Sequence, residues 1–424
     1  MRFLISLALL LCLSYDALAV PAPSRPQRKG RSFKVDRIRR RVAHGPSALR
    51  KAYAKYGIVP THFGLDLLDF EPIDPHQSSS TAVDDVAQPA ETGAVSASAV
   101  QGGAEFVSPV TIGGQKVVMD FDTGSSDMWV ISTNSPAAAQ QGHTVFDPAK
   151  STTFKTLDGA TFNITYGDQS FANGIVGMDT VDIGGATVTN QAIGLPTQLS
   201  QTFIEDTASN GLVGLAFSNI NTVRPQQQKT FFDNVAASLD EPVMTASLKA
   251  DGTGVYEFGT IDQTKFQGNM VNVSVDPTNG FWQFQSAEFA VGNGALQQIT
   301  TAPTAIADTG TTLMLSSPEV VMAYYSQVQG AVLANGVGGF IYPCNTQLPD
   351  LSVAVGGETL ATIPGSLLTF SQVGVNTTTG QPVCFGGLQS NQGSSLQIYG
   401  DVFLKSMFVV FDKRGPSLGF ASPA

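Results

Sequence analysis

A short motif that occurs twice constrains the fold of this chain more than any other feature of its sequence. Asp122-Thr123-Gly124-Ser125-Ser126 recurs as Asp308-Thr309-Gly310-Thr311-Thr312, and a run of apolar residues precedes both copies. Two apolar residues and a glycine follow each copy, as Leu212-Val213-Gly214 and as Ile398-Tyr399-Gly400. In both cases 92 residues separate the Asp from this Gly. Landmarks that keep one register indicate an internal duplication, which predicts two similar lobes related by an approximate twofold axis.

Short runs of strand-forming residues, separated by turns that contain glycine, dominate the chain after residue 105. They predict two strand pairs: Phe106 to Ile112 with Gln115 to Phe121 around Gly113-Gly114, and Phe162 to Tyr166 with Ile175 to Ile183. Few segments predict helices: residues 47–56, residues 230–239, and a segment that begins at Ser317-Pro318-Glu319. The expected fold class is therefore mostly β, with two lobes and a cleft between them.

The repeated motif also suggests chemistry. A single Asp-Thr-Gly is typically a turn in which the Asp side chain bonds its own backbone. Two copies related by a twofold axis would instead bring Asp122 and Asp308 together, and two carboxylates that close cannot both ionise, so they share one proton. One carboxylate can then take a proton from a water while the other gives a proton to a carbonyl oxygen. This arrangement predicts amide hydrolysis without a covalent intermediate.

With these motifs, the chain from about residue 105 to 424 resembles the pepsin-like aspartic proteases. The resemblance is greatest to the secreted fungal acid proteases of the penicillopepsin and aspergillopepsin type, and the front of the chain resembles a fungal propeptide. Five segments carry it: Phe121 to Ser126, Tyr166-Gly167-Asp168, Asn210 to Phe217, Ala307 to Thr312 and Tyr399 to Lys405.

The resemblance implies a role for each residue of the two motifs. Asp122 and Asp308 would be the catalytic pair, and Ser125 and Thr311 would hydrogen-bond their outer oxygens. Thr123 and Thr309 would cross-link the two loops below the pair. The backbone groups of Gly124 and Gly310 would hold an extended peptide, beside Thr312.

The resemblance further implies a flap that closes over the substrate. Tyr166 would lie on it, with Trp129 as its hydrogen-bond partner, and the backbone of Gly167 and Asp168 would contact the peptide. Phe203 and Leu212 would line an apolar pocket beside the cleaved bond, although these two residues and Trp129 are equally consistent with ordinary core. Hydrophobic residues on both sides of the cleaved bond are expected, and acids at Asp168 and Asp120 would also admit Lys before it.

Charge is distributed unevenly along the chain. Residues 20–60 hold 12 Lys and Arg against one acid, whereas the chain from Thr92 onward holds 10 Lys and Arg against 25 Asp and Glu. Residues 75–104 have the composition of an exposed linker. We interpret residues 20–91 as an inhibitory propeptide, with an end between about 85 and 100, and Lys55 as the residue that would reach the Asp pair. The alternatives are a basic tail that binds an acidic partner, or one that assists folding or export.

The first 19 residues predict a secretory signal peptide. Arg2 precedes the apolar run Phe3 to Leu13 and the small-residue sequence Ala17-Leu18-Ala19. Eleven apolar residues are too few to span a bilayer, which requires about 20. We therefore expect an extracellular, soluble monomer without a membrane anchor, with lobes at residues 92–275 and 276–424.

Secretion bears on the cysteines and on glycosylation. Cys12 would be lost with the signal peptide, leaving Cys344 and Cys384 to form a disulfide, with two buried free thiols as the alternative. In the chain-entropy model, closing a loop of that length with a disulfide contributes about 4 kcal/mol to the stability of the fold. Sequons for N-glycosylation occur at Asn163, Asn272 and Asn376.

Several classes of protein are excluded by composition. The formal net charge of −11 argues against nucleic-acid binding. Beyond the proposed propeptide the sole His is His143, and it lacks the motifs of a Ser or Cys protease or of a zinc site. We expect no metal and no cofactor, and extended peptides or unfolded proteins as substrates. A non-catalytic inhibitor or binding protein of the same fold is the alternative, although both Asp-Thr-Gly motifs are intact.

Overall fold

The computed structural model describes residues 32–42, 44–60, 70–72, 103–165, 171–251, 253–357 and 359–424. For residues 36–42, 70–72 and 103–106 it describes the backbone alone. Contacts divide the chain into the units Met1–Gly30 and Arg31–Ala424, and all described residues belong to the second. The proposed signal peptide lies outside the described residues. Within them, no helix combines the length and the apolar character needed to cross a membrane.

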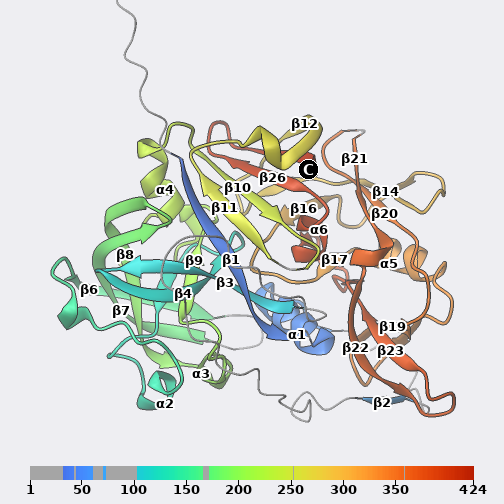
Figure 1. Cartoon of the computed structure of the whole chain (residues 1–424), viewed down its shortest axis with the longest axis horizontal. Helices are drawn as coiled ribbons and strands as arrows, with labels where there is room; N and C mark the ends of the chain where they lie inside the picture. The colour runs from blue at the N-terminus through green and yellow to red at the C-terminus, as the bar shows by residue number, and fades with distance from the viewer. Residues whose placement is uncertain are drawn as a thin grey trace, which may run out of the picture. The chain divides into compact units, whose positions relative to one another are not determined.

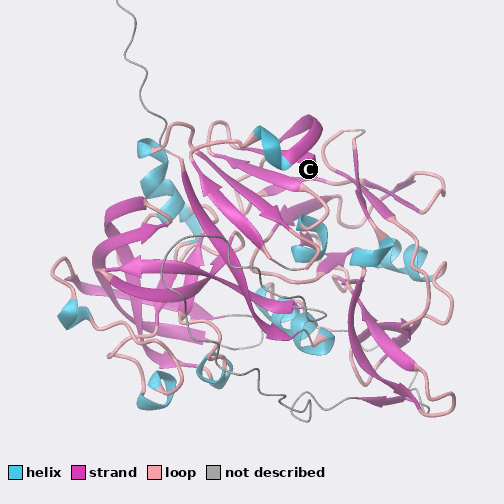
Figure 2. Ribbon diagram, viewed as in Figure 1, coloured by secondary structure: helices cyan, strands magenta, loops and turns pink. Residues whose placement is uncertain are grey.

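Strands are the predominant secondary structure of the described part, which confirms the mostly β class (Figure 2). They form four sheets there, and the largest has 13 strands. Its order is β12 (Phe266–Ser274), β27 (Ser417–Pro423), β26 (Phe408–Asp412), β10 (Val243–Leu248), β11 (Gly254–Phe258), β1 (Phe33–Val42), β3 (Gly103–Ile112), β4 (Gln115–Asp122), β9 (Gly211–Gly214), β5 (Met128–Val130), β8 (Ala186–Leu199), β7 (Phe171–Ile183) and β6 (Lys155–Thr165).

The other three sheets belong mainly to the C-terminal half of the chain (Figure 1). The first contains β13 (Gln283–Gln285), β16 (Thr304–Ala307), β25 (Gln397–Tyr399), β17 (Met314–Ser316) and β24 (Leu388–Ser390). The second contains β15 (Gln297–Gln298), β14 (Glu288–Val291), β20 (Leu351–Ala354) and β21 (Leu360–Ile363). The third contains β18 (Val332–Ala334), β19 (Gly339–Pro343), β23 (Pro382–Gly386), β22 (Thr369–Asn376) and β2 (Phe70–Pro72).

The helices of the described part are short: α1 (Gly45–Lys55), α2 (Ala137–Gln140), α3 (Gln201–Glu205), α4 (Phe231–Val235), α5 (Pro318–Tyr325) and α6 (Asp401–Leu404). The three predicted helical segments correspond to α1, to α4 with the 3-10 turn Ala236–Ser238, and to α5. In α4 the Thr230 hydroxyl accepts from the Asp233 amide, which caps the first turn. Both predicted strand pairs are also present, as β3–β4 and β6–β7.

The internal duplication appears as two copies of one strand motif. In the first, β4 runs parallel to β9 with Phe121 opposite Val213, and β5 runs antiparallel to β9 with Met128 opposite Val213. In the second, β16 runs parallel to β25 and β17 runs antiparallel to it, with Met314 opposite Tyr399. Corresponding residues are 186 positions apart, the separation of Thr123 and Thr309.

Two strands of the proposed propeptide belong to these sheets, which the sequence analysis did not predict. The first half of β1 pairs with β11 (Phe33 opposite Phe258), and its second half pairs with β3. The short strand β2 adds to the edge of β22, with Phe70 opposite Asn376. In Figure 1, β1 is the long blue strand, and the order of the sheet places it between β11 and β3. Two strands of the proposed propeptide, β1 and β2, thus join the sheets through backbone pairing.

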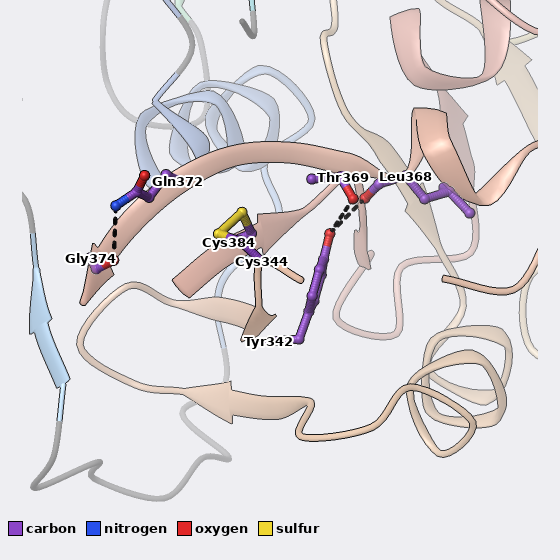
Figure 3. Close-up of a disulfide and its surroundings, with 7 residues drawn as sticks. All are labelled: Tyr342, Cys344, Leu368, Thr369, Gln372, Gly374 and Cys384. Carbon is purple, nitrogen blue, oxygen red and sulfur yellow. Dashed lines mark hydrogen bonds between the residues drawn. A yellow bond between two sulfur atoms is a disulfide. The ribbon is translucent and has the colours of Figure 1, made fainter. Parts of the chain in front are cut away.

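The predicted disulfide between Cys344 and Cys384 is present (Figure 3). Cys384 lies in β23, and Cys344 directly follows β19, the antiparallel neighbour in which Tyr342 is opposite Cys384. The Tyr342 hydroxyl donates to Thr369 Oγ1 of β22 at 3.0 Å. The disulfide and this bond together tie β19, β22 and β23 to one another.

Candidate active site

The ends of two equivalent strands position the two Asp residues. Asp122 is the last residue of β4, and Asp308 directly follows β16. Each of these strands is held by a parallel neighbour from the second landmark of the duplication, β9 for β4 and β25 for β16. Because both ends have the same register with their neighbours, the two Asp-Thr-Gly loops emerge from their sheets in the same way.

Four hydrogen bonds made by Thr123 and Thr309 join the two loops. Thr123 Oγ1 donates to the Ala307 carbonyl at 2.8 Å, and Thr309 Oγ1 donates to the Phe121 carbonyl at 2.7 Å. Each hydroxyl also accepts from the backbone amide of the opposite Thr, at 3.1 Å for Thr123 N and 3.0 Å for Thr309 N. Both side chains are buried. The two loops are therefore held to each other by a symmetric set of buried hydrogen bonds.

The carboxylates of Asp122 and Asp308 converge on a single atom, Lys55 Nζ. That ammonium donates to Asp122 Oδ1 at 2.5 Å, and to Asp308 Oδ1 and Oδ2 at 3.0 and 2.9 Å. Both carboxylates are essentially inaccessible to solvent, at 1% and 0% exposure. Three ionic groups therefore share one buried site, and the sequence had indicated Lys55 as the residue that would reach it.

Further donors fix the orientation of each carboxylate. Gly124 N donates to Asp122 Oδ1 at 2.8 Å, and Ser125 Oγ donates to Asp122 Oδ2 at 2.6 Å. Gly310 N donates to Asp308 Oδ1 at 3.0 Å. Thr311, the counterpart of Ser125, lowers the pKa of Asp308, but its Oγ1 makes no hydrogen bond of good geometry among the described residues.

Tyr56, which the sequence analysis did not assign to the site, takes the position beside Asp308. Its hydroxyl donates to Asp308 Oδ2 at 2.6 Å, and its ring contacts Phe281 edge to face at 6.0 Å. A Cβ at position 124 would lie 2.5 Å from the Tyr56 hydroxyl oxygen, and one at position 310 would lie 2.8 Å from Lys55 Nζ. The two motif glycines thus leave the space that this segment fills.

The electrostatics of the site differ between the two Asp residues. Burial acts to raise both pKa values. At Asp308 the Lys55 ammonium and the Thr311 and Tyr56 hydroxyls outweigh burial and lower the pKa to about 2. At Asp122, burial and the Asp308 charge outweigh Lys55 and keep the pKa above its ordinary value. Burial would lower the pKa of Lys55, but the two carboxylates raise it above its ordinary value, so this residue stays cationic.

Helix α1 brings Lys55 to the site, and an apolar contact holds the helix. Pro46 in the first turn and the His44 ring, which accepts from Ser47 N, start the helix. The Tyr53 hydroxyl donates to the Ser390 carbonyl at 2.7 Å. The helix packs in one cluster with residues of the C-terminal half: Ala48, Leu49, Ala52, Tyr53 and Ile58 with Ile306, Leu313, Leu315, Ala334, Val337, Ile341, Phe370, Val373, Val383, Phe385 and Ile398.

The predicted pocket residues Phe203 and Leu212 lie together with Trp129. Trp129, Leu212 and the partly buried Phe203 share one apolar cluster. The rings of Trp129 and Phe203 meet edge to face at 5.2 Å. The Trp129 indole nitrogen is buried and has no hydrogen-bond partner among the described residues. Its predicted partner Tyr166, with Gly167 and Asp168 of the flap, lies outside those residues.

The remaining predicted residues have varied surroundings. Asp120 is opposite Leu212 in the sheet, and its Oδ2 lies 3.9 Å from Lys51 Nζ. The Thr312 carbonyl accepts from Val402 N at 3.1 Å. Of the sequons, Asn163 and Asn272 are exposed on strands, whereas Asn376 is half-buried at the end of β22.

Comparison with known proteins shows what the chain is similar to. A family model described as eukaryotic aspartyl protease matches residues 105–423. A protein of Aspergillus fumigatus, named as an aspergillopepsin A-like aspartic endopeptidase, is 65% identical over the full length of both chains. Aspartic protease PEP3 of Coccidioides posadasii is 53% identical over 100% of this chain and 96% of its own. Penicillopepsin-1 of Penicillium janthinellum is 48% identical over 76% of this chain and 95% of its own.

Proposed function

Because this chain belongs to the eukaryotic aspartyl protease family, we propose that it is a secreted, monomeric zymogen whose Asp122–Asp308 pair hydrolyses peptide bonds once acid releases Lys55. The chain is an aspartic endopeptidase with the mostly β, two-lobed fold of that family. The observation that carries the finer proposal is the convergence of both carboxylates on Lys55 Nζ.

In the mature enzyme, a water would replace the Lys55 ammonium between the carboxylates. Aspartic proteases are the standard example of two carboxyl groups that share one proton, and this chain has the same pair. The ionised carboxylate takes a proton from the water, and the protonated one donates to the carbonyl oxygen of the substrate. Gly124 N and Ser125 Oγ would hold Asp122 in orientation throughout.

In the zymogen, the Lys55 ammonium excludes both the water and the shared proton. A neighbouring cation favours the ionised form of a carboxylate, so the pair cannot keep its catalytic proton while Lys55 is bound. Tyr56 adds a hydrogen bond to Asp308 and fills the adjacent space. The propeptide thus inhibits the pair by charge and by occupancy.

Substrate preference would follow from the surfaces beside the pair. The cluster of Trp129, Phe203 and Leu212 favours a hydrophobic residue before the cleaved bond. Lys51 Nζ lies 3.9 Å from Asp120 Oδ2, which supports room for a basic side chain near that acid. An ion pair at a partly exposed position contributes only about 1 kcal/mol, so the hydrophobic residue should still be preferred.

Replacing Asp168 by Ser is expected to reduce cleavage after Lys more than cleavage after Phe. The acid would pair with the substrate ammonium, whereas it contributes little to an apolar side chain. The measurement is the ratio of kcat/KM for two peptides that differ only in Lys or Phe before the cleaved bond. We expect the ratio to fall about fivefold, the equivalent of roughly 1 kcal/mol. The partly exposed acid Asp147 provides the control variant Asp147→Ser, and an unchanged ratio in Asp168→Ser would refute the preference.

Two runs of adjacent basic residues, the kind of site that a dibasic-specific protease cuts, lie in regular secondary structure. Arg39-Arg40-Arg41 belongs to β1 and pairs with β3, and Arg50-Lys51 lies within α1. Proteases cut exposed, unstructured segments in preference. A dibasic-specific endoprotease should therefore leave both runs intact in the folded zymogen at pH 7 and cut both in urea-unfolded chain. Mass spectrometry of the fragments gives the answer, and equally fast cleavage in folded and unfolded chain would show that these segments are open.

A non-catalytic binding protein of the same fold is the alternative function. Both Asp residues and their supporting donors are in place, which favours catalysis. The test is cleavage of haemoglobin or casein at acid pH by fully processed protein, with and without pepstatin. We expect cleavage that pepstatin stops, and no turnover would favour the binding protein. N-terminal sequencing of the secreted product would in turn establish the signal-peptide and propeptide boundaries.

A further inference from the structure

One lysine lies in a cage of aromatic rings, and hydrogen bonds connect this cage to the loop that carries Asp122. Lys413, in the turn between β26 and β27, places Nζ 2.6 Å from Asp233 Oδ1, and its side chain is only 12% exposed. Nζ also stands 4.2, 5.2 and 5.1 Å from the ring centres of Phe217, Phe232 and Trp282. A cation over an aromatic face is attracted by the ring, so three rings and one carboxylate attract the same ammonium. We call these five residues the Lys413 cage.

The charges of the cage depend on each other. Burial lowers the pKa of Lys413, and Asp233 offsets only part of that effect. Burial alone would raise the pKa of Asp233, but Lys413 with the Ser218 and Thr230 hydroxyls holds it below its ordinary value. Lys413 Nζ has no hydrogen bond of good geometry among the described residues, so its contact with Asp233 is an ion pair. Removing one partner would leave a largely buried charge unpaired.

Hydrogen bonds connect the cage to the loop of Asp122. Trp282 Nε1 donates to the Leu215 carbonyl at 3.0 Å, and Leu215 N donates to the Asp122 carbonyl at 2.8 Å. At the other end of the loop, Ser126 Oγ donates to the Phe217 carbonyl at 2.6 Å. Two cage residues are therefore bonded, directly or through Leu215, to the first and last residues of the Asp122–Ser126 loop.

The cage also joins the two proposed lobes. Phe217, Phe232 and Asp233 belong to the proposed N-terminal lobe, residues 92–275, whereas Trp282 and Lys413 belong to the proposed C-terminal lobe, residues 276–424. The rings of Phe217 and Trp282 are in contact, with 4.6 Å between their centres. This contact connects the two proposed lobes near the catalytic pair, in addition to the Thr123–Thr309 cross-link.

We propose that Lys413 is a positioning residue for the catalytic pair. Its cation fixes Phe217 and Trp282, and these two residues set the position of the Asp122 loop relative to Asp308. The inference rests on the proposed function, because it assumes that Asp122 acts in peptide hydrolysis.

The test compares four variants of the full-length chain with wild type, each activated at acid pH and checked for its N-terminus. Lys413→Met removes the charge and keeps the length of the side chain. Lys413→Met with Asp233→Asn removes both charges and leaves no ion unpaired. Lys413→Arg keeps the cation, and Lys150→Met removes an exposed lysine that pairs with Asp147. Thermal unfolding identifies the variants that fold, and kcat and KM are measured on one peptide.

We expect kcat to fall about tenfold or more in both variants with Met at position 413, because a small displacement of a catalytic group costs rate. KM should stay within about twofold, since the cage is not part of the substrate surface described above. Lys413→Arg should keep most of the wild-type kcat, and Lys150→Met all of it. If Lys413→Met does not fold, the double variant decides by the same criterion. A wild-type kcat in the folded Met variant, or equal losses in the Arg and Met variants, would overturn the proposal.

Tryptophan emission supplies a readout that does not depend on catalysis. The chain has two Trp residues, and Trp282 contacts the Lys413 ammonium. Emission should change in Lys413→Met and remain that of wild type in Lys150→Met, and an unchanged spectrum in Lys413→Met would contradict the cage. A wild-type protein that cuts no peptide would contradict the proposed function instead, while the emission measurement would still test the cage.

Discussion

Peptide hydrolysis is expected to fall about a thousandfold or more when either Asp122 or Asp308 is replaced by Asn, because the amide can neither take a proton from the water nor donate one as the shared acid. The fold should survive both substitutions. The Thr123–Thr309 cross-link does not involve the carboxylates, and Asn keeps an oxygen to accept from the loop amides. The two variants should lose activity equally, because the chemistry needs both members of the pair.

The measurement requires mature protein, since neither variant could remove its own propeptide. Trace wild-type enzyme can cut the variant zymogens in trans and then be separated through an affinity tag. Initial rates on one peptide are compared with those of Asp147→Asn, which changes a partly exposed acid outside both Asp-Thr-Gly loops. Retention of even a tenth of the wild-type rate in either Asn variant would contradict the mechanism.

The second large effect concerns Lys55. In full-length Lys55→Met, the onset of self-processing is expected to move upward by about one pH unit or more from that of wild type. Met fills similar space but leaves both carboxylates without their cation, and a buried pair without a cation takes up its shared proton at higher pH. The remaining contacts of α1, such as the Tyr53 hydroxyl with Ser390, would then hold the propeptide alone.

The pH window follows from the pKa of Asp308. Its folded-state value, about 2, lies below the ordinary value of 3.8. A lowered carboxyl pKa stabilises the inhibited state fully above the ordinary value, and this contribution is lost as the pH falls from about 4 towards 2. Wild-type zymogen should therefore begin to release its propeptide at about pH 3–4. Salt should weaken the part of the neutral-pH inhibition that comes from attraction between exposed charges, since screening acts beyond about 8–10 Å at moderate ionic strength.

Lys51→Met is the matched control for Lys55→Met. Lys51 lies on the same helix, but its side chain is half-exposed and its Nζ is 3.9 Å from Asp120. A partly exposed pair at this distance contributes little, so its loss should shift the onset of processing by much less. Equal onsets in Lys55→Met and wild type, followed by mass spectrometry across the pH range, would show that Lys55 does not hold the pair.

Features with a local or repeated signal could be predicted from the sequence. The helix around Lys55 has a clear start and an apolar face, and the glycine pair Gly113-Gly114 marks the turn between β3 and β4. The duplication predicted the convergence of Asp122 and Asp308, because equal spacing to Gly214 and Gly400 implies equal strand pairing. The position of Lys55 at the Asp pair was predicted from charge, because the front segment is basic and the rest of the chain is acidic.

Features that depend on distant partners could not be predicted. Strand β1 shows apolar–polar alternation at Phe33, Lys34, Val35 and Asp36, but its high charge is more typical of an exposed, solvated segment than of a strand in a large sheet. Strand β2 is three residues long, and only its neighbour β22 makes it a strand. The Lys413 cage unites residues that are up to 196 positions apart, which no local pattern indicates. Tyr56 had a signal, its place next to Lys55, which the sequence analysis did not use.

The most direct test of the account follows the N-terminus of purified full-length protein by mass spectrometry at pH 7 and at pH 3.5, with Asp122→Asn beside wild type. We predict that wild type stays intact and inactive at pH 7 and loses its propeptide at pH 3.5, whereas Asp122→Asn stays intact at both. Full activity of uncut wild type at pH 7 would contradict the inhibition by Lys55. Maturation of pure Asp122→Asn at the wild-type rate would contradict self-processing by the Asp122–Asp308 pair.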